Sequence, residues 1–240
     1  MLPLLVFAAA VVTAEAGLCH SVCSPPPGTS THDFISRDIN DQHFINITSL
    51  TAGKLTLIVN VASFCGLTQH YHQMNALLSE FPPSSFTILA FPCNQFGHQE
   101  PGNNGTEILN GLRYVRPGNG FQPHPNLHMM LKTEVNGDQE HDLYGYLKTS
   151  CPQPDTAKFY PGESFWDPIL VNDITWNFEK FLVSPSGVPL YRFRPKVEPF
   201  DLKYLMKSLL NPAENLTAQT QELTLLLHRL EESWIKRDGQ

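Results

Sequence analysis

Two segments of the chain have the nearly continuous apolar character of strands buried on both faces. Residues 54–63 read KLTLIVNVAS and residues 85–91 read SFTILAF, and both are rich in β-branched and large apolar side chains. Between them, residues 67–80 lack Gly and Pro and place apolar side chains at helical spacing. This order predicts a strand, a helix and a second strand, with a right-handed crossover that makes the two strands parallel.

The rest of the pattern predicts more helices and one hairpin. Residues 106–115, 141–149 and 200–210 are predicted helices. Apolar runs at 178–183 and 188–193 flank a Ser-Pro-Ser-Gly turn, which is typical of an antiparallel hairpin. The whole order predicts an α/β thioredoxin-like fold over residues 33–210, with a central mixed β-sheet flanked by helices.

The first 32 residues are predicted to lie outside this domain. Residues 2–12 are an unbroken apolar run, too short for a membrane span of about 20 residues, and a small-x-small site follows at Ala14 to Ala16. Residues 1–16 are therefore a predicted secretory signal peptide of an extracellular protein. Residues 17–32 are polar and Pro-rich and predict a flexible arm. Three Asn-x-Ser/Thr triplets are then candidate glycosylation sites: Asn46, Asn104 and Asn215.

The last segment, residues 211–240, is a predicted helical tail. One helical stripe carries its large apolar side chains: Leu223, Leu226, Leu227, Leu230 and Trp234. Three interpretations are open for this stripe: packing on its own domain, docking of a partner, and contact with a membrane surface. No stretch of the sequence is long and apolar enough to predict a membrane span.

Charge and composition exclude several classes of protein. The formal net charge is -7, from 23 acidic and 16 basic residues, which disfavours a nucleic-acid binder. The hydrophobic fraction of 41% is enough for a sizeable core. No metal site is predicted, because His70 and His72 do not share a helical face and no further ligands occur at metal-binding spacing. Five cysteines leave at least one thiol unpaired or bonded to another chain.

Cys65 is the candidate reactive thiol. It follows the first predicted strand and opens the predicted helix, and a helix N-terminus stabilises a thiolate and lowers its pKa. No second cysteine lies two residues away, so the segment is not a Cys-x-x-Cys disulfide oxidoreductase motif. The alternative is a buried structural cysteine, and the predicted topology alone does not decide between the two.

Three longer motifs resemble those of the glutathione peroxidase family. They are NVASFCGLT at 60–68, FPCNQFGHQEPG at 91–102 and WNFEKFLV at 176–183. With YVRPG at 114–118 they extend the resemblance over residues 33–210. The resemblance implies a peroxidase with Cys65 as nucleophile, and it places Gln99, Trp176 and Asn177 at the other catalytic positions. Their neutral N–H groups suit stabilisation of a thiolate and of the departing oxygen.

The resemblance also implies the substrates. Hydrogen peroxide and organic hydroperoxides would be reduced, and glutathione or another external thiol would regenerate Cys65, with no metal or organic cofactor. Arg116, Arg194 and Lys196 are the candidate contacts to anionic glutathione. His70 and Asn103 replace basic residues of cytosolic members. Cys65 stands where many animal members have selenocysteine, which predicts slower turnover.

Two further expectations follow from the resemblance. The loop at 115–121 is similar to one present in tetrameric members, which predicts a homotetramer. The other cysteines are poor candidates for resolving the oxidised Cys65: Cys93 is predicted to lie in the core, Cys151 resembles a position common in secreted members, and Cys19 and Cys23 lie in the arm, where a local or intersubunit disulfide is open. The alternative function is a catalytically weak binding or redox-sensing protein on the same fold.

Overall fold

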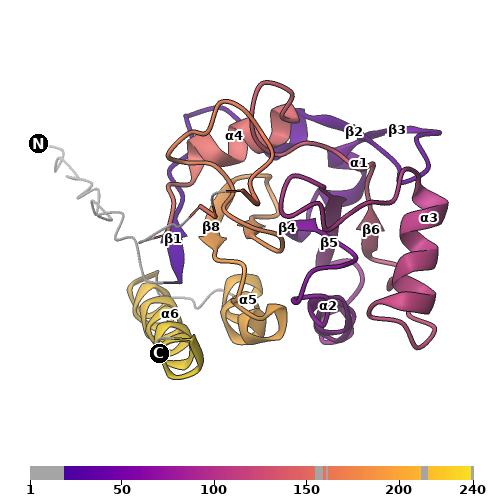
Figure 1. The fold of residues 1–240 in the computed structure, drawn as a ribbon. Helices are drawn as coiled ribbons and strands as arrows, with labels where there is room; N and C mark the ends of the chain where they lie inside the picture. Colours follow the sequence, from indigo (N-terminus) through magenta and orange to yellow (C-terminus); the bar gives the residue numbers. More distant parts are fainter. Residues whose placement is uncertain (1–18, 155–158, 161, 212–215, 239–240) are drawn as a thin grey trace, which may run out of the picture.

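A six-stranded mixed sheet forms the centre of the molecule (Figure 1). The structure is a computed structural model that describes residues 19–154, 159–160, 162–211 and 216–238. The strand order is β1-β8-β7-β4-β5-β6, in which β4, β5 and β6 are parallel and the remaining neighbours are antiparallel. The strands are β1 His20–Val22, β4 Leu55–Val61, β5 Phe86–Pro92, β6 Leu127–Met129, β7 Lys180–Val183 and β8 Pro189–Phe193.

Helices cover both faces of the sheet, which explains the continuous apolar runs of its central strands. Every residue of β4 and β5 is buried. Leu57 and Val59 of β4 face the core shared with α2 and α5, whereas Ile58 faces the core shared with α1 and α4. The helices are α1 Ile47–Thr51, α2 His70–Leu78, α3 Gly105–Asn110, α4 Asp142–Ser150, α5 Lys203–Leu210 and α6 Leu216–Asp238. The predicted fold class is therefore confirmed.

The N-terminal segment differs from the prediction. Residues 20–22 form β1, which pairs antiparallel with the edge strand β8, so the segment 17–32 is not simply a flexible arm. Cys23 is joined to Cys151 at the end of α4 by a disulfide with an S–S distance of 2.05 Å. The prediction failed because three residues are too few to show a strand period. The predicted signal peptide, residues 1–16, lies outside the described residues.

Short elements account for the other differences. β2 (Ile35–Arg37) and β3 (Phe44–Asn46) form a separate two-stranded hairpin that the pattern did not predict, and β6 was also missed. The predicted helix at 106–115 is α3 followed by a π-helical turn at Gly111–Val115. The predicted helix at 200–210 is a 3₁₀ turn, Pro199–Leu202, followed by α5.

The tail packs on its own domain. In α6, Leu230 is buried, and Leu223, Leu227 and Trp234 pack against the same core as α2 and α5. Figure 1 shows α6 beside α5 and close to β1. Of the three interpretations of the apolar stripe, packing on the domain is therefore the one observed. None of the helices in the described part of the chain combines the length and apolarity needed to cross a membrane.

Candidate active site

The three sequence motifs meet at one edge of the sheet. Cys65 lies in the turn after β4, and Gln99 lies in the loop after β5. Because β4 and β5 are parallel, their carboxyl ends lie at the same edge. β7 runs antiparallel to β4, so the segment that leads into β7, with Trp176 and Asn177, arrives at that edge too.

Asn60 at the end of β4 holds the third motif in place. Its side-chain amide donates a hydrogen bond of 3.0 Å to the carbonyl of Trp176, and its side-chain oxygen accepts one of 3.0 Å from the backbone of Glu179. The backbone N–H of Phe178 donates to the carbonyl of Asn60 at 2.6 Å. Phe178 has a φ of 67°, which a non-glycine residue adopts only where its surroundings enforce it. Asn60 thus fixes the backbone around Trp176 and Asn177.

Glu100 holds the turn that carries Cys65. Its buried carboxylate accepts hydrogen bonds from the backbone N–H and the hydroxyl of Ser63, at 2.8 and 2.7 Å. The backbone N–H of Phe64 donates to the carbonyl of Gln99 at 2.9 Å. The first two motifs are therefore joined directly, through the two residues that precede Cys65.

The predicted catalytic side chains lie together. The amide of Asn177 donates a hydrogen bond of 3.0 Å to the side-chain oxygen of Gln99. A Cβ atom at Gly97 would lie 3.4 Å from the side-chain nitrogen of Gln99 and 3.5 Å from the ring of Trp176. These two side chains therefore both lie next to Gly97. Gly97 has a φ of 60°, and the absence of a Cβ there allows this approach.

The Cys65 thiol is buried and only 2% exposed. Burial raises its pKa above the ordinary value of 9.0, while hydrogen bonds from the Leu67 backbone, Trp176 and Asn177, and the charge of Arg116, each lower it. The N–H of Leu67 lies 3.4 Å from the sulfur. The expected low-pKa thiolate at a helix N-terminus is therefore wrong in two respects: α2 begins only at His70, and burial outweighs the stabilising contacts.

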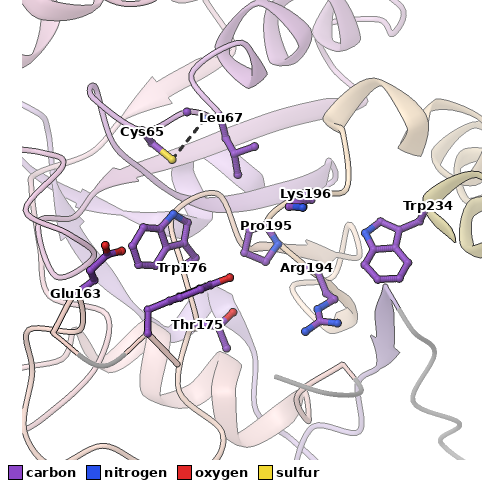
Figure 2. A pocket seen from close by; sticks show the side chains of 11 residues that line it. Cys65, Leu67, Glu163, Thr175, Trp176, Arg194, Pro195, Lys196 and Trp234 are labelled. Atoms are coloured by element: carbon purple, nitrogen blue, oxygen red, sulfur yellow. Dashed lines mark hydrogen bonds between the residues drawn. The ribbon is translucent and has the colours of Figure 1, made fainter. Parts of the chain in front are cut away.

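A pocket of about 540 Å³ opens beside Cys65 (Figure 2). Trp176 and Leu67 lie near the sulfur, and Arg194 and Lys196 lie further along the lining. Trp234 of α6 completes the far side, with the Arg194 guanidinium carbon 5.8 Å from its ring centroid. The full lining is Cys65, Gly66, Leu67, Tyr160, Glu163, Thr175, Trp176, Arg194, Pro195, Lys196 and Trp234.

Comparisons with known proteins agree with this geometry. The glutathione peroxidase family model matches residues 31–148. Glutathione peroxidase 6 of Mus musculus is 48% identical over 171 residues, which are 71% of this chain and 76% of the relative. The epididymal secretory glutathione peroxidase of Rattus norvegicus is 54% identical over 142 residues, 59% of this chain and 63% of the relative. The chain belongs to the glutathione peroxidase family.

A solved structure supports the same assignment. The crystal structure of T. cruzi GPX1 matches with a TM-score of 0.55 and 27% identity, and the match covers 76% of this chain and 97% of that one. Membership of the glutathione peroxidase family confirms the resemblance found in the sequence. The chain is accordingly an oxidoreductase of the peroxidase class.

The basic residues predicted at the site separate into two groups. Arg194 and Lys196 line the pocket, whereas Arg116 is exposed and donates to the carbonyl of Phe64 at 3.3 Å. His70 adds no positive charge at the site, because burial lowers its pKa to about 2 and keeps the imidazole neutral. Trp234 was not predicted at the site, since it lies 169 residues from Cys65 and its helical stripe indicated only packing.

The other predicted sites are placed as follows. The side chains of Asn46 and Asn104 are exposed and cap α1 and α3, whereas Asn215 lies outside the described residues. Cys93 is buried, and burial raises the pKa of its thiol to about 12. Cys23 pairs with Cys151 rather than with Cys19, which is a buried free thiol.

Proposed function

We propose that this chain is a secreted thiol peroxidase in which Cys65 reduces hydrogen peroxide and organic hydroperoxides. The observation that carries the proposal is the position of the Cys65 sulfur at a pocket, within reach of the neutral side chains of Trp176 and Asn177, with Gln99 bonded to Asn177. Neutral donors suit this reaction, because they stabilise negative charge on sulfur and on the leaving oxygen without titrating themselves.

The proposed reduction of the peroxide needs only the Cys65 thiolate, the peroxide and a proton, with no metal or organic cofactor. The Cys65 thiolate attacks one peroxide oxygen, a sulfur–oxygen bond forms, and the oxygen–oxygen bond breaks. The electron pair leaves with the second oxygen, which takes up a proton and departs as water or an alcohol. The sulfur is oxidised to a sulfenic acid. One thiol then forms a mixed disulfide with release of water, and a second thiol restores Cys65 and leaves as a disulfide.

An external thiol is the proposed reductant. Cys23 and Cys151 are already joined, which removes both as resolving thiols. Cys93 and Cys19 are buried free thiols, and burial raises the pKa of each. Since a thiol attacks as its thiolate, neither is suited to reach an oxidised Cys65. Arg194 and Lys196 in the pocket lining, with Arg116 nearby, favour an anionic thiol such as glutathione.

The replacement Trp176→Phe tests the peroxide step. The reactive thiolate becomes more abundant as pH rises toward the raised pKa of Cys65, so the rate of peroxide consumption should rise with pH. Loss of the indole hydrogen bond removes a contact that lowers this pKa. The pH–rate profile should therefore move to higher pH, and the rate at neutral pH should fall by roughly 10- to 100-fold.

Tyr160→Phe is the matched control for this experiment. Tyr160 lines the same pocket with its ring centroid 5.2 Å from that of Trp176, and the variant loses only a hydroxyl group. Its profile should superimpose on that of the unmodified protein. A Trp176→Phe profile that also superimposes would contradict a role for Trp176 in stabilising the thiolate.

The replacement Arg194→Gln tests the choice of thiol. If Arg194 attracts the carboxylates of glutathione, its loss should raise KM for glutathione by about three- to tenfold, as expected for one partly exposed charge contact. The rate with a neutral thiol such as 2-mercaptoethanol, and the rate of the peroxide step, should not change. Arg113→Gln, an exposed position outside the pocket lining, is the control. An equal loss with both thiols would rule out charge recognition.

Secretion and assembly form the remaining part of the proposal. The Cys23–Cys151 disulfide and the exposed Asn46 and Asn104 suit an oxidising, glycosylating route, and the relative from rat is named a secretory protein. Tyr114 and Val115, at the start of the loop that predicts a homotetramer, are strongly exposed, which suits a subunit contact. Native mass measurements on the secreted protein, before and after glycan removal, test both the glycosylation and the homotetramer.

A further inference from the structure

The junction between β1 and α6 brings together three metal-ligating side chains from opposite ends of the chain. Glu231 accepts two hydrogen bonds of 2.9 Å from the backbone N–H of Cys19, one on each carboxylate oxygen. The Nδ1 atom of His20 lies 2.7 Å from the same carboxylate. The thiol of Cys19, a ring nitrogen of His20 and a carboxylate oxygen of Glu231 lie within 4.8 Å of one another. Among the residues that the structure describes, these are the three His, Cys, Asp or Glu side chains that lie close enough together to hold one metal ion.

The cluster is well shielded from solvent. Cys19 is fully buried, His20 is 7% exposed, and the side chain of Glu231 is 13% exposed. The rings of Tyr191 and Phe193 both contact the imidazole of His20, with centroid distances of 6.2 Å, and so limit its rotation. A thiol, an imidazole and a carboxylate are the side-chain types that bind Zn²⁺ in proteins. We propose that Cys19, His20 and Glu231 form a zinc-binding site that joins the N-terminal strand to the tail helix.

The dimensions of the cluster suit this ion after small side-chain movements. In a tetrahedral site the zinc–sulfur distance is about 2.3 Å and the zinc–nitrogen and zinc–oxygen distances are about 2.0–2.1 Å, so ligand atoms lie roughly 3.3–3.6 Å apart. The present separations range from 2.7 Å for His20–Glu231 to at most 4.8 Å. The His20–Glu231 contact must open by about 0.6 Å, and the longest separation must close by about 1.2 Å at most. A water molecule would supply the fourth ligand at the partly exposed side of Glu231.

The charges of the cluster also favour a cation. The Cys19 thiol and the Glu231 carboxylate lie within 4.8 Å of each other, and metal binding would release the proton of the thiol. Arg194 and Lys180 interact electrostatically with Cys19, and their positive charges oppose a dication. Two anionic ligands, thiolate and carboxylate, balance the charge of the bound ion itself.

Metal binding would fix the helix that completes the pocket. Trp234 follows Glu231 by three residues, so both lie on the same face of α6. Glu231 contacts β1, and Trp234 lines the pocket beside Arg194. The site itself does not depend on the proposed peroxidase chemistry, because Cys65 is not one of its ligands.

Titration of the purified chain with Co²⁺ and Zn²⁺ alone tests the site. After treatment with a chelator and a reductant that leaves the Cys23–Cys151 disulfide intact, one equivalent of Co²⁺ should give a sulfur-to-metal charge-transfer band. Zn²⁺ should displace it and raise the midpoint of thermal unfolding. Cys19→Ser should abolish the band. Glu231→Gln should weaken Zn²⁺ binding by about 100-fold or more, whereas loss of a group that only supports a ligand typically costs 10- to 100-fold.

Matched variants separate this site from other metal-binding groups. Glu231→Gln keeps an oxygen acceptor for the Cys19 backbone, so its fold should persist, which circular dichroism checks. Cys65→Ser and Cys93→Ser remove the other free thiols, and His228→Gln removes an exposed histidine of the same helix; none should alter binding. The proposal is overturned if the unmodified chain binds less than one equivalent, or if the Cys19→Ser and Glu231→Gln variants bind Zn²⁺ as tightly as it does.

Discussion

Replacing Cys65 with serine is expected to lower kcat/KM for hydrogen peroxide by about 10³-fold or more, as the loss of a covalent nucleophile does in other enzymes. Serine keeps the shape of the side chain, but its hydroxyl stays protonated at neutral pH and cannot form a sulfenic acid. Stopped-flow measurement of peroxide consumption, with thiol in excess, gives the rate. Intact mass after a brief exposure to peroxide should show one added oxygen on the unmodified chain and none on the variant.

Cys93→Ser is the matched control for the nucleophile. Cys93 is a free thiol that is as well buried as Cys65, and its sulfur lies 3.5 Å from the side-chain oxygen of Gln95, which a serine hydroxyl can also contact. This variant should keep its activity. If Cys65→Ser instead consumes peroxide at the unmodified rate, Cys65 is not the nucleophile. If the unmodified chain itself shows negligible turnover, the alternative of a binding or redox-sensing protein is favoured.

The central sheet could be predicted because its signal is local. β4 and β5 are buried on both faces, so most of their residues are apolar, and the turn between β7 and β8 is marked by Pro and Gly. The grouping of Gln99, Trp176 and Asn177 was predicted from the family motifs. The hydrogen bond between Asn177 and Gln99 agrees with that prediction, although the catalytic role of these residues stays a prediction.

The missed features depend on contacts between distant segments. Cys23 pairs with a cysteine 128 residues away, and Glu231 reaches β1 across more than 200 residues, so no local pattern reports either contact. The raised pKa of Cys65 has the same origin. A helix N-terminus can be inferred from the sequence, but the burial that outweighs the stabilising contacts is produced by tertiary packing.

Replacing Arg192 with methionine is expected to destabilise the fold by about 3–5 kcal/mol, the usual effect of leaving one member of a buried ion pair uncompensated. Arg192 is fully buried and pairs with Glu179, and its guanidinium also donates to the carbonyls of Cys151, Asn172 and Asp173 at 3.0–3.1 Å. It therefore joins the end of α4, the segment before Trp176, and strands β7 and β8. Equilibrium unfolding in urea, at fixed protein concentration, measures the loss.

The same replacement should impair activity, because the network continues toward the site. The carboxylate of Glu179 also accepts hydrogen bonds from the backbone and hydroxyl of Thr175, at 3.0 and 2.9 Å, next to Trp176. Arg37→Met, in an exposed pair with Asp41, should change stability by less than about 1 kcal/mol. In the double variant Arg192→Met, Glu179→Met, Glu179 is not left as a buried charge without Arg192, so the double variant should be more stable than Arg192→Met alone. If Arg192→Met alone is as stable as the unmodified chain, the Arg192–Glu179 pair does not support the segment next to Trp176.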